Sequence, residues 1–188
     1  MRSLTEYLTE VAHDGELVNT FFEERLFDLV GVLERIVTTL EAEGIAYQLV
    51  GGLAVLVHVE EANPEHSTLT GNVDLMVERT DLDRIRAVAT HARFRSTEGV
   101  DMLVWGRHTV RLTFGIRGSI APVRKQILGV DVMVIPGAEL VRMKLSSFRA
   151  KDRVHVRSMD AAGLISVAVE QSLPTELKDR LRIIRETE

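Results

Sequence analysis

The sequence contains no cysteine among its 188 residues, so it can form neither a disulfide framework nor a zinc site built from thiolates. Its longest uncharged apolar stretch, from Gly44 to Val59, is interrupted by Gln48 and a pair of glycines, and is shorter than the roughly 20 residues that span a bilayer. The acidic N-terminal stretch lacks the apolar run of a signal peptide. With 45% hydrophobic and 27% charged residues, the composition is that of a globular protein, which we expect in the cytoplasm and away from membranes.

Basic and acidic residues are distributed unevenly along the chain. The formal net charge is −5, yet the segment from Leu103 to Arg157 carries 11 Lys and Arg against 3 Asp and Glu, whereas the remainder carries 12 against 25. Such an excess indicates either a surface that meets an anionic partner or arginines spread over separate faces. Both interpretations stay open, because the sequence does not say which of these side chains converge.

The hydrophobic pattern predicts a long N-terminal helix. Apolar residues recur at alternating steps of four and three from Val18 to Leu40, and Gly44 is expected to end the helix after about seven turns. We expect this stripe to pack against the protein's own core, with a two-helix contact to a second copy as the alternative. One domain in three parts is expected: a helical region (1–44), an α/β core (45–136) and a helical C-terminal region (137–188).

Strand and helix patterns alternate over the rest of the chain. Strands are expected near residues 45–50, 72–78, 99–105, 108–116 and 129–135. Helices are expected near residues 53–59, 81–92 and 138–158 and after Pro174, with Asp81 as the cap of the second. This order predicts an α/β or α+β sheet with a helical C-terminal part.

Two glycines, Gly51 and Gly52, separate the first expected strand from the helix behind it. A turn without Cβ atoms lets the backbone approach a ligand closely, and the helix N-terminus behind it offers unpaired N–H groups to a phosphate. On the next expected strand, Asn72 and Asp74 share one face because side chains alternate. Neighbouring carboxylates hold Mg²⁺ in phosphoryl and nucleotidyl transfer, and here the first of the two positions carries an amide.

The order of these features resembles the nucleotidyltransferase superfamily, in particular small bacterial proteins related to minimal nucleotidyltransferases and abortive-infection toxins. VGGLAVLVH matches the strand, glycine turn and helix of that pattern, and TGNVDLMV matches the strand that carries its acids. KLSSFRAKDRVH is similar to a later helix with the pattern Lys-x-x-Ala-x-x-x-Arg/Lys-Asp-x-x-Asp. The resemblance extends from about Tyr47 to Arg157 and implies a mixed sheet flanked by helices.

The resemblance also implies roles for particular residues. It implies that Asp74 and Lys144 are catalytic and that a nucleoside triphosphate is the substrate or ligand. The nucleotide-binding residues that it implies are Gly51, Gly52, Arg111, Lys144, Arg149, Lys151 and Asp152. The Mg²⁺ ligands that it implies are Asp74, Asn72 and Asp131. On a helix, Lys144, Ser147, Lys151 and His155 would share one face.

The chain departs from the family pattern at the metal site. Asn72 stands in place of the first acid, Thr68 in place of an arginine, and His155 in place of the last acid of the later helix. The third acid aligns with Arg111 or with Asp131, and we prefer Arg111 because the strand with Asp131 runs into a segment that normally follows the catalytic strands. Because an amide brings no charge and Mg²⁺ gives up its waters reluctantly, these replacements predict weak metal binding.

Three functional hypotheses follow. The first is a metal-dependent nucleotidyltransferase that moves a nucleoside monophosphate from a triphosphate to RNA, protein or a small molecule. The second is a nucleotidyltransferase-like protein without that activity, which binds a nucleotide or an anionic partner and uses Arg111 for the charge of the metal. The third is an interaction module, either one half of a toxin–antitoxin pair or a homodimer joined by the N-terminal helix.

Overall fold

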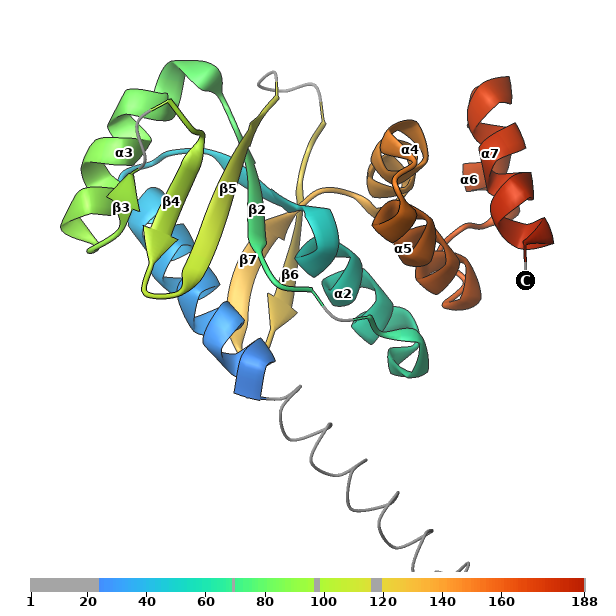
Figure 1. The fold of residues 1–188 in the computed structure, drawn as a ribbon, viewed down its shortest axis with the longest axis horizontal. Coiled ribbons are helices and arrows are strands. Elements are labelled where there is room, and N and C mark those ends of the chain that lie inside the picture. Colours follow the sequence, from blue (N-terminus) through green and yellow to red (C-terminus); the bar gives the residue numbers. More distant parts are fainter. Residues whose placement is uncertain (1–23, 69, 97–98, 116–119, 188) are drawn as a thin grey trace, which may run out of the picture.

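A computed structural model of the protein describes residues 24–187, except residues 69, 97–98 and 116–119. A seven-stranded sheet lies at the centre of the described part, with the strand order β3-β4-β5-β2-β1-β7-β6 (Figure 1). Its strands are β1 (Tyr47–Val50), β2 (Val73–Val77), β3 (Arg95–Ser96), β4 (Met102–Trp105), β5 (His108–Phe114), β6 (Val123–Ile127) and β7 (Val130–Val134). β1 runs parallel to β7 and β2 parallel to β5, while the other neighbours are antiparallel, so the expected mixed sheet is confirmed.

The N-terminal helix (residues 24–42) lies behind the sheet in Figure 1. Its apolar stripe is buried in the core through Leu29, Leu33, Ile36 and Leu40. The stripe therefore packs against the protein's own sheet, as expected, and over the described residues it is not available to a second copy. Gly44 follows the helix with φ +63°, the left-handed conformation that suits glycine after a helix end. The predicted start of the helix at Val18 lies outside the described residues.

Six further α-helices complete the described part. They are α2 (Gly51–Ala62), α3 (Leu82–His91), α4 (Gly137–Ser147), α5 (Ala150–Ala161), α6 (Val167–Gln171) and α7 (Thr175–Glu186). Asp81 occupies the N-cap position of α3, as predicted, although its side chain makes no capping hydrogen bond. None of the helices in the described part is both long enough and apolar enough to cross a membrane.

The single helix predicted over residues 138–158 is wrong, because the chain forms α4 and α5 with a sharp break between them. Phe148 adopts a left-handed conformation with φ +48°, and Arg149 is extended. The break is not marked by glycine or proline, so local sequence signals do not reveal it. The Phe148 ring instead packs beneath the guanidinium groups of Arg153 and Arg180, at 5.7 and 5.2 Å from its centroid.

The two faces of the sheet differ in polarity. Leu75 on β2 and Leu112 on β5 are buried, and they alternate along their strands with the less buried Asp74 and Arg111. Because successive side chains of a strand point to opposite faces, the acid and the arginine share the face away from this apolar core. α2 begins beside that face, α4 and α5 pack against α2, and α7 packs against both α4 and α5. This arrangement places a cleft between the sheet and the C-terminal helices.

Candidate functional site

A cleft of about 370 Å³ opens where β1 ends and α2 begins. β2 and β5 form one wall of the cleft, and α4 and α5 form the other. The residues that the sequence predicted and the cleft brings together are Gly51, Gly52, Asn72, Asp74, Arg111, Lys144, Arg149, Lys151 and Asp152. Segments that are far apart in the sequence thus meet at one site. Of the predicted site residues, only Asp131 does not line the cleft.

The two glycines allow the carboxylate of Asp74 to lie directly against the first turn of α2. Gly51 has φ +74°, and a Cβ atom there would overlap the Asp74 carboxylate. A Cβ atom on Gly52 would lie only 2.5 Å from Oγ1 of Thr70. Val50 is the N-cap residue of α2, and in the described part of the chain its side chain makes no capping hydrogen bond. The N–H groups of its first turn are therefore free to bind an anion in the cleft.

On the sheet wall, Asp74 and Arg111 stand directly opposite each other in the parallel pairing of β2 and β5. Nη1 of Arg111 lies 3.6 Å from Oδ1 of Asp74. Burial raises the pKa of Asp74, and the positive charges of Arg111 and Lys144 counter only part of this rise. An arginine thus faces the acid at the place where the family alignment expects another carboxylate.

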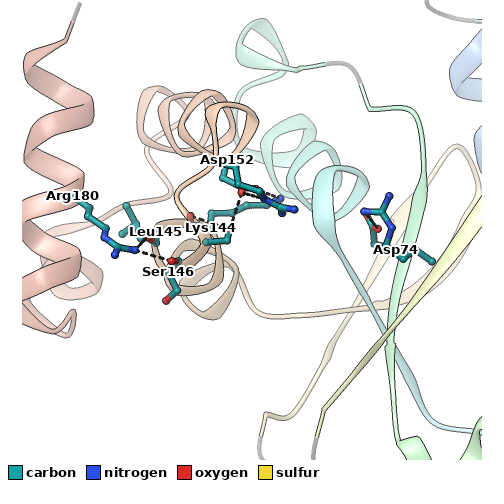
Figure 2. A network of polar contacts seen from close by, with 9 residues as sticks. Asp74, Lys144, Leu145, Ser146, Asp152 and Arg180 are labelled. Atoms are coloured by element: carbon teal, nitrogen blue, oxygen red, sulfur yellow. Dashed lines mark hydrogen bonds and ion pairs between the residues drawn. The ribbon is translucent and has the colours of Figure 1, made fainter. Parts of the chain in front are cut away.

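On the helical wall, Asp152 is wholly buried and is bound by three side chains. It accepts hydrogen bonds from Nε of Arg149 at 2.7 Å, Oγ of Ser147 at 2.7 Å and Nζ of Lys144 at 3.2 Å. Burial alone would raise the pKa of Asp152, but these hydrogen bonds and the charge of Lys144 hold it well below its usual range. Figure 2 shows this network between α4 and α5, with Asp74 across the cleft on β2.

Lys144, which the family resemblance implied to be catalytic, is buried, and its ammonium group binds Asp152. Burial lowers the pKa of Lys144, while the adjacent charge and hydrogen bond of Asp152 oppose that change. The contact holds α4 to α5, and α7 holds α4 from the other side. Arg180 on α7 donates to the carbonyl oxygens of Leu145 and Ser146 at 2.8 and 2.7 Å (Figure 2). This wall of the cleft is therefore a fixed scaffold.

Asp131, the alternative third acid, lies outside the cleft. It is exposed on β7, where Nη1 of Arg124 on β6 lies 3.5 Å away and Nε2 of Gln126 lies 3.4 Å away. The geometry thus separates Asp131 from Asp74 and brings Arg111 to Asp74 instead. The sequence favours Arg111 for this position because the strand with Asp131 runs into a segment that normally follows the catalytic strands, and the parallel pairing of β2 with β5 places Arg111 opposite Asp74.

The basic segment divides between the cleft and the outer surface. Four of its cations line the cleft, namely Arg111, Lys144, Arg149 and Lys151. Others bind acids elsewhere, as Arg107 does with Asp28 and Lys125 with Glu61. The basic residues of this segment therefore converge in part on the cleft and in part form ion pairs on other surfaces.

The site contains a residue that stands out in the sequence as a replacement and as a member of one helix face, but to which no role was assigned. His155 on α5 lines the cleft and is buried, with 7% of its surface exposed. Its Nδ1 atom has no hydrogen-bond partner among the described residues. Burial, followed by the charge of Lys144, lowers the pKa of His155 to about 4, so the ring is neutral at pH 7. Its four-residue spacing from Lys151 on α5 was the signal that could have identified it, whereas the spacing from Lys144 crosses the break at Phe148.

The chain has the fold of the nucleotidyltransferases. No protein-family model matches the sequence, and no curated protein matches it, so the relation is seen through structure. ANT(2″)-Ia, solved in complex with adenylyl-2″-tobramycin, is 13% identical with a TM-score of 0.56, and the match covers 84% of this chain and 97% of that one. The Megavirus polyadenylate synthase is 10% identical with a TM-score of 0.59, over 88% of this chain and 39% of that one.

A third solved structure is an antigenic nucleotidyltransferase-like protein from Paracoccidioides brasiliensis. It is 16% identical with a TM-score of 0.58, and the match covers 87% of this chain and 89% of that one. At these identities the likeness is one of fold. The activity of this chain must be argued from its own cleft.

The cleft residues do not fit a magnesium site of the kind that the family implies. Asp152 is engaged by three donors, which leaves Asp74 as the available carboxylate among the described cleft residues. Asn72 can offer an uncharged oxygen, but Arg111 places a positive charge beside Asp74. No group of three or more acids or histidines in the described part of the chain could hold a metal. Mg²⁺ usually requires carboxylates together with substrate phosphates, so this donor set is unsuited to it.

Proposed function

We propose that this protein binds the phosphate chain of a nucleotide in the cleft without a metal ion, and that it has lost the metal-dependent transfer reaction of its fold. One observation carries the proposal: Arg111 stands beside Asp74, where a transferase of this fold would place a further carboxylate. A guanidinium group at that position repels a cation. It also offers the donors that match phosphate oxygens in pairs.

The charge of the cleft supports this proposal. Two acids, Asp74 and Asp152, face four cations, so the lining carries an excess of positive charge. Lys151 is exposed and has no ion-pair partner among the described residues, and the Arg149 side chain remains 60% exposed although it binds Asp152. Both side chains can reach a bound anion without breaking the scaffold.

Each part of the cleft has a separate role in this proposal. The first turn of α2 binds one phosphate through its N–H groups, which the glycine turn leaves accessible. Arg111 binds from the sheet wall, where it supplies the positive charge that a metal supplies in active transferases. Arg149 and Lys151 bind from the helical wall. Lys144 contributes to the positive field and keeps Asp152 in place.

Calorimetric titration of a non-hydrolysable nucleoside triphosphate tests the proposal. We expect binding whose affinity changes by less than about threefold between excess EDTA and millimolar Mg²⁺, because the charges that bind phosphate are fixed in the protein. Arg111→Ala should weaken binding by about tenfold or more, as expected for a lost charge-assisted contact. Arg182→Ala, an exposed arginine on α7 outside the cleft, is the matched control and should bind normally. Tight binding only in the presence of Mg²⁺ would overturn the proposal.

Nucleotidyl transfer is the second candidate, and one observation favours it. The likeness to ANT(2″)-Ia, whose structure holds an adenylylated aminoglycoside, covers nearly all of that chain. In this case Asp74 would be the acid that remains for transfer from a triphosphate to a hydroxyl group. Radiolabelled triphosphate with Mg²⁺ or Mn²⁺ can be offered to RNA, protein and small hydroxyl acceptors. If no label is transferred, or if Asp74→Asn transfers equally well, this candidate is excluded.

A further inference from the structure

His155 is a buried polar residue whose bonding is incomplete. Its ring lies against the first turn of α2, since Cε1 is 3.3 Å from the position that a Cβ atom on Gly52 would occupy. Its Nδ1 atom is buried and lacks a hydrogen-bond partner in the described part of the chain. Leaving such an atom unbonded is costly, because burial removes its water without replacing it. A ligand atom that came within hydrogen-bond distance of Nδ1 would complete its bonding.

The surroundings of His155 favour an anion as that ligand. α4 contributes Lys144 near the ring, and α5 contributes Lys151 and Asp152 together with Arg149 at its start. α2 adds the N–H groups of its uncapped first turn and no charged side chain there. Three cations and one acid therefore act on the ring, and the acid is occupied by hydrogen bonds within the scaffold. The carboxylate of Asp74 on β2 also lies against the first turn of α2, so three cations meet two acids at this place.

We infer that His155 contacts, through Nδ1, the phosphate that binds at the N-terminus of α2, and that it takes up a proton when this anion binds. The inference rests on the proposed function, because it assigns a residue and a pH dependence to the same phosphate site. It is independent of Arg111, which lies on the opposite wall of the cleft.

The direction of the pH effect follows from the charges. In the free protein, burial and neighbouring cations keep His155 neutral, with its pKa lowered to about 4. A bound dianion offsets these cations and accepts a hydrogen bond, so the pKa of His155 is higher in the complex. A group with a higher pKa in the complex takes up a proton on binding. Affinity therefore increases as the pH falls through the pKa of the complex, and it levels off below the pKa of the free protein.

Sulfate is a suitable probe, because it stays dianionic throughout the range from pH 5 to pH 8, whereas phosphates titrate there. At constant ionic strength, we expect the wild-type protein to bind sulfate about tenfold more tightly at pH 5.5 than at pH 7.5. In the NMR spectrum of the wild-type protein, saturating sulfate should raise the pKa of the His155 ring by about 2.5 units, the rise that a tenfold change in affinity over this pH range requires. This second readout needs no variant and so does not depend on one folding.

Two substitutions distinguish the contact of His155 with the anion from the uptake of a proton by its ring. His155→Asn keeps a polar atom close to the position of Nδ1 but cannot be protonated, so it should bind sulfate within about threefold of wild type at pH 7.5 and lose the pH dependence. His155→Leu should bind about tenfold more weakly at pH 7.5, again without pH dependence. His58 provides the matched control, as it is also buried but its Nε2 already contacts the Ile135 carbonyl oxygen at 2.8 Å. His58→Gln should retain the wild-type affinity and pH dependence.

The outcomes distinguish this inference from the proposed function. Should His155→Asn keep the wild-type pH dependence, or should the ring of His155 be unaffected by sulfate, the inference is wrong. If His155→Leu binds tripolyphosphate normally while Arg111→Ala does not, the proposed function stands and the role of His155 falls. Absence of any sulfate or tripolyphosphate binding to the wild-type protein would overturn both.

Discussion

The two walls of the cleft each place an acid beside basic residues, but they hold these acids differently. Asp152 on the helical wall is wholly buried and is fixed by three donors. Asp74 on the sheet wall remains 15% exposed and meets Arg111 at 3.6 Å. The comparison teaches that an acid within a family motif can serve the scaffold rather than the ligand. The bonding of each acid, more than its place in the motif, indicates its role.

The comparison predicts its largest effect for the helical wall. Asp152→Asn should lower the free energy of unfolding by about 3–5 kcal/mol, because it leaves the Lys144 ammonium buried without its counter-charge. Urea denaturation measures this change. The double substitution Lys144→Met with Asp152→Leu should recover much of the loss, since it removes both buried charges. A double variant as unstable as the single one would show that packing, rather than the unpaired charge, causes the loss.

The same wall should also control stability in acid. The folded-state pKa of Asp152 is depressed, so its contribution is fully present above the ordinary carboxyl pKa and is lost as the pH falls through the folded value. Below about pH 4, we expect the free energy of unfolding of the wild type to fall by up to about 1.4 kcal/mol per pH unit from this group. Asp152→Asn should show a shallower dependence in urea titrations at each pH. Parallel curves for the two proteins would contradict the assignment.

The sheet wall can be altered to test whether Asn72 and Arg111 account for the proposed loss of metal binding. Asn72→Asp together with Arg111→Asp replaces an amide and a cation beside Asp74 with carboxylates, the ligands that Mg²⁺ prefers. We expect triphosphate to bind this double variant about tenfold more tightly with Mg²⁺ than with EDTA, while the wild type shows no such difference. Calorimetry of both proteins under both conditions measures the contrast. Equal binding by the double variant in EDTA and in Mg²⁺ would mean that the lost charges do not explain the metal site.

The smallest effect is expected for Asp74 itself. Burial raises its pKa in the folded state, so carrying the charge there costs free energy at neutral pH, and this cost disappears as the pH falls and the group is protonated. Asp74→Asn should therefore leave the free energy of unfolding within about 1 kcal/mol of wild type, or increase it. The urea titration used for Asp152→Asn provides the direct comparison. A loss as large as that of Asp152→Asn would place both acids in the scaffold.

Much of the fold was predictable because its signals are local. Alternating apolar residues marked β2, the glycine pair at Gly51 and Gly52 marked the turn into α2, and the repeat of the N-terminal helix marked its buried stripe. The break at Phe148 was not predictable, because its left-handed conformation is marked by no glycine or proline and its ring contacts Arg153 and Arg180 on α5 and α7 only in the folded structure. The short strands β3 and β6 were also missed, since neither shows a clear alternation of its own.

The sequence by itself determined β1, the glycine turn and α2, which meet at the cleft, because each depends on residues within a few positions of one another. Only the tertiary structure decided how the charges pair. In a continuous helix, the backbone positions of Lys144 and Asp152 would be about 12 Å apart along the axis. The break at Phe148 lets the two side chains meet, with Nζ of Lys144 3.2 Å from Oδ1 of Asp152. The parallel pairing of β2 with β5 likewise brings Arg111 to Asp74. Such pairings depend on which segments meet in space, which no local pattern records.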